Sequence, residues 1–313
     1  MKQVAAVHVP VMLHRVVELL SPALTGVPDP VLVDATLGLG GHAAALLDAC
    51  PAARLIGIDR DPDALALAAV RLAPFGERVR LVEAVFDELP EVLGTVRAAA
   101  ILMDLGLSSL QIDDLDRGFA YASDAPLDMR MGGGGKKTAA DLVNNMSADD
   151  LAGILWRYGD ERNARRIAQA IVANRPFARS GELVAVIAGA VPASKRPAGH
   201  PAKRTFQALR IAVNGELDAL ATTLPAALGA LALGGRLAVI SYHSGEDRLV
   251  KRAFARATSD LVPAGVPEVP EGFRATHVLL TRGAERPTPG ETARNPRAAS
   301  ARLRAVVRKE ASL

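Results

Sequence analysis

The feature that most constrains the fold is a glycine-rich turn between two short apolar runs. The first run, residues 31–33, ends at the acid Asp34, and the second, residues 55–58, ends at Asp59. An alanine- and leucine-rich stretch between them has the composition of a helix, which Pro51 ends. Short apolar runs of this kind form buried strands. We therefore expect a right-handed unit of strand, turn, helix and strand, with a ligand at the carboxyl ends of the strands.

The glycine turn by itself is compatible with two kinds of ligand. Gly38, Gly40 and Ala43 match the G-x-G-x-x-G/A pattern of dinucleotide-binding proteins, with Asp59 near the distance expected for a ribose contact. Asp34, however, would place a carboxylate beside the pyrophosphate. It would suit a cationic ligand such as S-adenosylmethionine, whose ribose hydroxyls Asp59 could bind. The residues favour S-adenosylmethionine over a dinucleotide, and a turn that binds nothing is the third interpretation.

Further apolar runs predict a larger sheet. The strand candidates are residues 79–85, 98–103 and 236–241, followed by 276–281 and 303–308 as a closing antiparallel pair. Asp34, Asp59 and Asp104 then end three of the first four strands, which is better explained by a shared cleft than by chance. The predicted fold class is α/β, with a Rossmann-like sheet of about seven strands as in S-adenosylmethionine-dependent methyltransferases.

The alternation of strands and helices stops near Ile112, and helical patterns follow as far as residue 210. We expect an inserted all-helical domain at residues 112–210, within a discontinuous methyltransferase core domain of residues 1–111 and 211–313. Trp156 and Tyr158 are expected to be core anchors of the helical domain rather than base-stacking residues. Two other helices are expected at residues 8–20, closed by Ser21-Pro22, and at residues 211–224.

Charge is unevenly distributed along the chain, although the net charge is only +3. Residues 1–110 have a balance of −5 and residues 157–210 a balance of +8. A basic segment that follows an acidic nucleotide-binding segment predicts a polyanionic partner such as RNA. The alternative is a basic face that only contacts solvent.

Composition excludes several other classes of protein. Cys50 is the single cysteine, which excludes an internal disulfide framework and an all-cysteine metal site, and we expect no metal. The chain has no run of about 18 apolar residues, and its first residues lack the apolar core of a signal peptide. We therefore expect a cytoplasmic protein without a membrane partner. The sequence does not indicate the oligomeric state.

Several motifs together make the chain resemble the ribosomal RNA small subunit methyltransferase H family, the bacterial 16S rRNA cytosine-N4 methyltransferases. The resemblance covers nearly the whole chain. The motifs are His8-Val-Pro-Val-Met-Leu, Asp34-x-Thr-x-Gly-x-Gly-Gly-His42, Gly57-Ile-Asp-Arg-Asp-Pro62, Asp104-Leu-Gly-x-Ser-Ser-x-Gln111, Arg117-Gly-Phe, Pro126-Leu-Asp-Met-Arg-Met131, His200-Pro-Ala-x-Arg-Thr-Phe-Gln-Ala208, Ser241-Tyr-His-Ser-x-Glu-Asp-Arg248 and Asn295-Pro-Arg297.

The resemblance implies a function and a set of donor-binding residues. The implied reaction transfers a methyl group from S-adenosylmethionine to N4 of a cytidine in the decoding centre of 16S rRNA, in the small ribosomal subunit. The family positions that hold the donor correspond to Gly40, Gly41, His42, Asp59, Phe86, Asp104 and Gln111. Gln111 comes from the resemblance alone, whereas Asp59, Phe86 and Asp104 are also strand-end residues in the predicted sheet.

Two residues are candidates for the catalytic proton acceptor. Asp104 is the first, although it is also a donor-binding candidate, and His243 at the end of the fifth strand is the second. A structural role for His243 is an equal alternative. The family usually has leucine where this chain has Gly245, which bears on the turn around His243.

The basic segment supplies candidate phosphate contacts. These are Arg165, Arg166, Lys195, Arg196, Lys203 and Arg204, with Arg294, Arg297 and Arg302 as an alternative docking face. Two other functions are compatible with the fold: a dinucleotide-dependent oxidoreductase, and an RNA-binding protein without catalytic activity.

Overall fold

The computed structural model describes residues 10–132, 137–191, 199–260 and 273–309. Two compact units make up the chain: residues 1–106 together with 217–313, and residues 107–216. These limits lie a few residues outside the expected insertion of 112–210, so the loop after Asp104 and the turn at Gly215 belong to the second unit.

The first unit is built on a sheet of seven strands in the order β3-β2-β1-β4-β5-β7-β6. The strands are β1 (Val31–Asp34), β2 (Arg54–Asp59), β3 (Val79–Glu83), β4 (Ala98–Asp104), β5 (Leu231–Ser241), β6 (His277–Leu279) and β7 (Arg302–Arg308). The first five are parallel, whereas β7 runs antiparallel to both β5 and β6. The predicted α/β class, the strand number and the antiparallel end of the sheet are confirmed.

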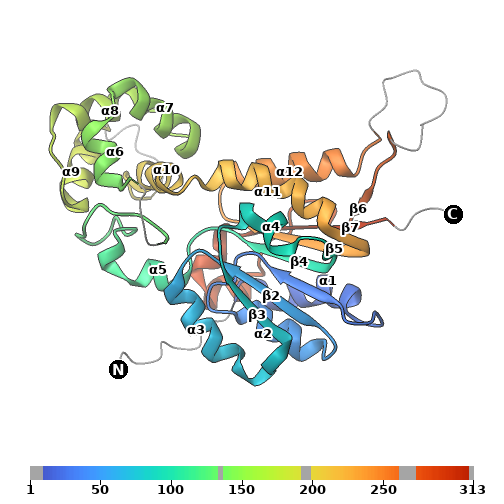
Figure 1. Cartoon of the computed structure of the whole chain (residues 1–313). Helices are drawn as coiled ribbons and strands as arrows, with labels where there is room; N and C mark the ends of the chain where they lie inside the picture. The colour runs from blue at the N-terminus through green and yellow to red at the C-terminus, as the bar shows by residue number, and fades with distance from the viewer. Residues whose placement is uncertain (1–9, 133–136, 192–198, 261–272, 310–313) are drawn as a thin grey trace, which may run out of the picture. The chain divides into compact units, whose positions relative to one another are not determined.

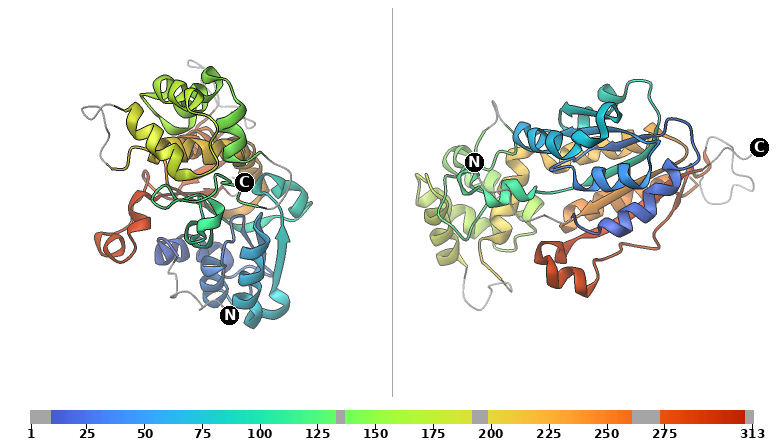
Figure 2. Two further views of the ribbon diagram at one scale, coloured as in Figure 1. Left: turned by 90° about the vertical axis from the view of Figure 1, so that its left-hand side faces the viewer. Right: turned by 90° about the horizontal axis from the view of Figure 1, so that it is seen from below.

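Side chains alternate between the two faces of this sheet, and each face is covered by helices (Figure 1). Leu32 and Leu102 pack with α1 (Leu13–Leu24), α2 (Gly41–Ala49) and α3 (Pro62–Leu72), the helices drawn from blue to cyan (Figure 2, right). Val33 and Ile101 pack on the other side with α4 (Leu89–Leu93), α11 (Glu216–Ala230) and α12 (Ser244–Ala257). Burial of both faces explains why these strands are continuously apolar.

Several predicted boundaries in the first unit were wrong. Helix α1 runs through Pro22 to Leu24, because the burial of Ala23 and Leu24 compensates for the hydrogen bond that proline cannot make. Strand β3 ends at Glu83, so Phe86 begins a short 3₁₀ turn, Phe86–Glu88, instead of ending the strand.

The second unit is helical around its own apolar core. Its helices are α5 (Ser109–Asp113), α6 (Ala139–Asn145), α7 (Ala148–Gly159), α8 (Ala164–Ala173), α9 (Ser180–Ala190) and α10 (Lys203–Asn214). The helix predicted at 211–224 was wrong: α10 ends at Asn214, and Gly215 adopts a left-handed conformation with φ 64° before α11 begins. Across the described ranges, the helices are too short or too polar to cross a membrane.

The expected role of Trp156 as a core anchor was wrong. Its side chain is 64% exposed on α7, whereas Leu151, Leu155 and Gly159 form the buried stripe of that helix. Tyr158 is half-buried and does pack against the core.

Candidate active site

The carboxyl edge of the first unit's sheet brings together the three strand-end acids. Strand β1 lies between β2 and β4, so Asp34 is paired with Gly57 on one side and with Leu102 on the other. Asp59 and Asp104 each lie two residues further along these neighbouring strands. The negative charges of Asp104 and Asp59 both raise the pKa of Asp34, as expected for carboxylates that share one site.

Asp34 is the most deeply buried of these acids, with 2% of its surface exposed. Burial is the main cause that raises its pKa to about 8, and the like charges nearby add to this effect. One hydrogen bond opposes the shift, since the backbone N–H of Thr36 donates to Asp34 Oδ1 at 3.2 Å. The carboxyl group is therefore protonated at neutral pH, and a cation beside it would favour the ionised form.

The glycine turn brings the backbone close to Asp59. The N–H of Gly38 donates to Asp59 Oδ2 at 2.7 Å, and Gly40 has φ 71°, a left-handed conformation that favours glycine. Helix α2 begins at Gly41, where an added Cβ would lie only 2.5 Å from Pro10 Cγ. The turn therefore requires glycine at both positions, at Gly40 for its backbone conformation and at Gly41 for space.

Asp59 is held by backbone donors on both carboxylate oxygens. Gly38 occupies one position on Oδ2, and the N–H of Asp61 donates to Oδ1 at 2.9 Å. Burial raises the pKa of Asp59, and these two hydrogen bonds oppose the increase. A carboxylate oxygen accepts more than one hydrogen bond, so both oxygens keep capacity for the two hydroxyls of a ribose.

Asp104 lies in a cluster of polar side chains at the end of β4. The Tyr242 hydroxyl donates to Asp104 Oδ1 at 2.8 Å, and Oδ2 lies 3.7 Å from His42 Nδ1. Thr36 fixes the backbone of the same residue, because its Oγ1 accepts from the Asp104 N–H at 2.6 Å. Burial raises the pKa of Asp104, whereas His42 and the Tyr242 hydrogen bond act in the opposite direction.

The protonation of His42 follows from its other nitrogen. Nε2 lies 2.9 Å from the carbonyl oxygen of Val11, and a carbonyl oxygen only accepts, so Nε2 carries a proton. Nδ1, the other ring nitrogen, lies on the side of Asp104.

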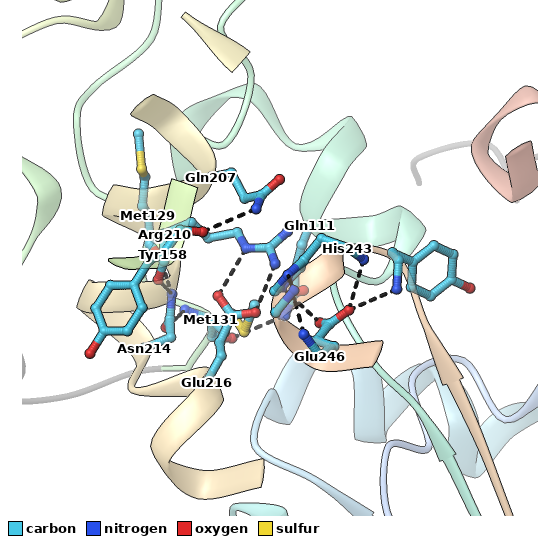
Figure 3. Close-up of polar contacts among 12 residues, drawn as sticks. Gln111, Met129, Met131, Tyr158, Gln207, Arg210, Asn214, Glu216, His243 and Glu246 are labelled. Carbon is cyan, nitrogen blue, oxygen red and sulfur yellow. Dashed lines mark hydrogen bonds and ion pairs between the residues drawn. The ribbon is translucent and has the colours of Figure 1, made fainter. Parts of the chain in front are cut away.

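His243 lies at the start of α12, where it acts as a helix cap (Figure 3). Its Nδ1 accepts from the N–H groups of Gly245 and Glu246, at 3.2 and 3.4 Å, and Nε2 lies 3.2 Å from Glu246 Oε1. An added Cβ at Gly245 would lie 3.1 Å from the His243 ring and from Leu217, so glycine leaves room for this arrangement. These contacts occupy the lone pair that a proton acceptor would need.

The remaining donor-binding candidates lie in different places. Phe86 is half-buried and packs against the apolar core beside β2 and β4. Gln111 belongs to the second unit, where Oε1 accepts from the Ser108 N–H at 3.1 Å and Nε2 donates to the Met131 carbonyl at 3.2 Å. Asn214 accepts from the Met131 N–H, which extends this network (Figure 3). The assignment of Gln111 to the donor site stays a prediction.

The candidate phosphate contacts are on α8 and α10 of the second unit. Arg165, Arg166 and Lys203 are exposed, whereas Arg204 is half-buried and donates to the Asp160 carbonyl at 3.0 Å. Lys195 and Arg196 lie outside the described residues.

Sequence reasoning missed Tyr242 and Thr36 as members of the site. Tyr242 directly follows β5, which pairs with β4 up to Asp104, so its place after a strand of the same edge was an available signal. Thr36 follows β1 in the same way, but nothing in the sequence indicated that its hydroxyl reaches the backbone of β4.

A parallel sheet that closes with an antiparallel pair and carries helices on both faces is the Rossmann-like fold of S-adenosylmethionine-dependent methyltransferases. The sequence pattern of the MraW methylase family matches residues 5–309, and the chain belongs to that family. The resemblance inferred from the motifs is therefore confirmed.

Relatives named ribosomal RNA small subunit methyltransferase H are similar over nearly the full length. The Saccharopolyspora erythraea protein is 58% identical over 308 residues, which cover 96% of this chain and 93% of the relative. The Nocardioides protein is 57% identical over 308 residues, covering 96% of both chains. The Nocardia farcinica protein is 53% identical over 321 residues, covering 99% of both.

Proposed function

We propose that this chain transfers a methyl group from S-adenosylmethionine to N4 of a cytidine in the decoding centre of 16S rRNA. The observation that supports this function best is the cluster of Asp34, Asp59 and Asp104 around a glycine turn. The buried Asp34 suits a cationic donor, and Asp59 suits a ribose. Asp104 lies beside His42. Names of the relatives support rRNA as the substrate.

The test is transfer of labelled methyl from S-adenosylmethionine to 16S rRNA, followed by mapping of the modified nucleoside. We expect N4-methylcytidine at one decoding-centre position. Assays on protein-free 16S rRNA and on the assembled small subunit, side by side, identify the substrate. Absence of transfer with both would refute the proposal, and tight NADH binding without S-adenosylhomocysteine binding would favour the oxidoreductase.

In this proposal the glycine turn holds the donor. The donor lies against Gly40, Gly41 and His42. Asp59 accepts hydrogen bonds from both ribose hydroxyls, and the half-buried ring of Phe86 lies against the adenine. Gln111 would complete the set. The neutralised Asp34 would regain its charge opposite the ammonium or sulfonium group of the donor.

Asp59→Ala should weaken binding of S-adenosylhomocysteine by about 10- to 150-fold, since hydrogen bonds to a charged group contribute about 1.5–3 kcal/mol. Isothermal titration calorimetry measures this change. Asp63→Ala, an exposed acid of the first turn of α3, is the matched control and should bind normally. Equal affinity in the Asp59 and Asp63 variants would remove Asp59 from the donor site.

The chemistry assigned to Asp104 is to take up the proton that N4 must lose. The N4–methyl bond forms as the carbon–sulfur bond breaks, S-adenosylhomocysteine leaves, and one N4 proton passes to Asp104. His42 is the proposed next acceptor of that proton, since its Nδ1 lies 3.7 Å from Asp104 Oδ2. Alignment of N4 with the donor methyl supplies the remainder of the rate enhancement, up to about 7–11 kcal/mol in favourable cases.

His243 is the less favoured proton acceptor, because its Nδ1 already accepts two backbone hydrogen bonds. We propose that it keeps α12 in place behind Tyr242. The target base must leave its stack to reach any acceptor at this edge, as in other enzymes that modify bases.

The second unit is proposed to bind RNA phosphates through Arg165, Arg166, Lys203 and Arg204. The +8 balance of residues 157–210 supports this proposal. Arg204 has an additional structural role at the end of α7, since it donates to the Asp160 carbonyl. A test of phosphate binding is therefore better made at the two arginines of α8.

Replacing Arg165 and Arg166 together by alanine should make RNA binding less dependent on salt. Each phosphate contact on a single strand contributes a log–log slope of about −0.7, so the loss of two should reduce the steepness by about 1.4. Filter binding across a salt series measures the slope. Arg179→Ala, an exposed arginine of the same unit already paired with Asp124, is the control and should leave the slope unchanged. The same slope in both variants and the parent would place the docking face elsewhere.

A further inference from the structure

Trp156 is the single tryptophan of the chain, and it is 64% exposed rather than part of the apolar core. Leu151, Ala152, Leu155 and Gly159, all of them buried, form the core-facing stripe of α7. Trp156 follows Leu155 by one residue and is therefore turned about 100° away from it around the helix axis. Its 64% exposure is a consequence of helix geometry and not of a loose core.

Few large apolar side chains of this unit are exposed. Among its described residues, the large apolar side chains that are exposed are Leu115, at 49%, and Trp156. Burial of an aromatic side chain of this size stabilises a fold, so solvent exposure forgoes a sizeable gain. Large aromatic surfaces that face solvent mark binding sites more often than solitary aliphatic ones do.

Three of the arginines that follow Trp156, namely Arg162, Arg165 and Arg166, differ from several other arginines of the unit. Four arginines are paired with carboxylates, namely Arg117 with Asp114, Arg130 with Asp128, Arg179 with Asp124, and Arg210 with Glu216. Arg162, Arg165 and Arg166 have no hydrogen-bond or ion-pair partner for their guanidinium groups within residues 10–132, 137–191, 199–260 and 273–309.

These three arginines lie beside the end of α7 that carries Trp156. Trp156 is one turn from the C-terminus of α7, Arg162 lies in the short connection to α8, and α7 packs on α8. Arg165, Arg166 and Gln169 lie on the exposed face of α8, at the spacing of one helix face, and Arg162 is exposed just before the helix begins. Between Trp156 and Arg166 a single acid, Asp160, is exposed, because Glu161 is buried.

We propose that Trp156 is a stacking platform for one unpaired base of the RNA substrate, and that Arg162, Arg165 and Arg166 hold the phosphates beside that base. The combination of an exposed aromatic ring and arginines without carboxylate partners is the pattern by which proteins bind single-stranded nucleic acid. A protein partner would fit less well, since it would have to supply several carboxylates at this face. The proposal depends on RNA being the substrate, as proposed above.

The chain provides its own reporter for this test. Because Trp156 is the single tryptophan, tryptophan emission from the intact protein reports on this position alone. Titration with protein-free 16S rRNA should quench the emission with the same midpoint as RNA binding measured by filter retention. Trp156→Ala should weaken RNA binding about 5- to 150-fold, the range found for one stacked base, and Trp156→Phe should restore most of the loss. Phe273→Ala, an exposed aromatic of the first unit, is the matched control and should bind RNA normally.

The outcomes separate this proposal from the proposed function. Normal RNA affinity in Trp156→Ala, with no change in tryptophan emission of the parent protein, would overturn the stacking role while labelled methyl transfer stays intact. Failure of the parent protein to methylate both protein-free 16S rRNA and the assembled small subunit would instead refute the proposed function. Salt dependence should remain nearly parental in Trp156→Ala, because a ring contributes no counterion release.

Discussion

Asp104→Asn is expected to lower the rate of methyl transfer by about 100- to 10,000-fold, the contribution usual for a positioned general base. Asparagine has nearly the shape of aspartate, and its carbonyl oxygen can still accept from the Tyr242 hydroxyl that now binds Asp104 Oδ1 at 2.8 Å. It cannot take up the N4 proton. Single-turnover transfer of labelled methyl measures the rate, and calorimetry with S-adenosylhomocysteine measures donor affinity, which should change little.

Two comparison variants identify the role of Asp104. His243→Ala should retain far more activity than Asp104→Asn, because the Nδ1 lone pair of His243 already accepts two backbone hydrogen bonds that cap α12. Tyr242→Phe should have an intermediate effect, since it removes a hydrogen bond to Asp104 but keeps the ring beside Gly106. A parallel fall of rate and donor affinity in Asp104→Asn would assign this residue to donor binding instead.

Donor affinity is expected to increase about tenfold between pH 6 and 7 and less steeply up to pH 8, which amounts to about 50-fold over the range. Burial raises the pKa of Asp34 to about 8, so the free protein holds a neutral carboxyl group below that pH. A cationic donor favours the ionised group, and binding must then release the proton. Calorimetry in buffers of different ionisation enthalpy should detect that release. Comparison of S-adenosylhomocysteine with a donor analogue of permanent positive charge should show which cationic group Asp34 faces.

Asp34→Asn should abolish this pH dependence. The same variant should also change how folding stability depends on pH. The folded carboxyl group binds its proton up to about pH 8, whereas an unfolded one releases it near pH 4. The folding stability of the parent protein therefore falls as the pH rises between these values. The stability of the asparagine variant should fall less over the same range. An unchanged pH dependence of both properties would show that Asp34 does not titrate in this range.

The apolar runs predicted the sheet well, because strands buried on both faces are mostly apolar. The residues after the strands were harder to place. Phe86 was expected at the tip of β3, but the strand ends at Glu83 because the next residues turn into a 3₁₀ segment. The helix break at Gly215 was missed because apolar spacing continues across it, and one glycine decides where α10 ends.

The site was predictable where position along a strand was enough. Asp34, Asp59 and Asp104 were identified because parallel strands present their carboxyl ends at one edge. The contacts of His42 with Val11 and Asp104 were not predictable, since they depend on the orientation of one ring. Trp156 was misassigned for a related reason: composition favours a buried tryptophan, whereas one position around the helix separates it from the core-facing stripe.

The contacts around the glycine turn determine when the site can form during synthesis of the chain. Val11, which binds His42, is next to Met12, whose N–H donates to Glu291 Oε1 across 279 residues. Arg15 is likewise bound to Glu285, 270 residues later. Strand β5, which pairs with β4, follows the whole second unit. A nascent chain can therefore complete its local contacts early, including that of His42 with Val11. The contacts that hold Met12 and Arg15 beside them must wait until almost the entire chain has been made, because Glu285 and Glu291 are among its last residues.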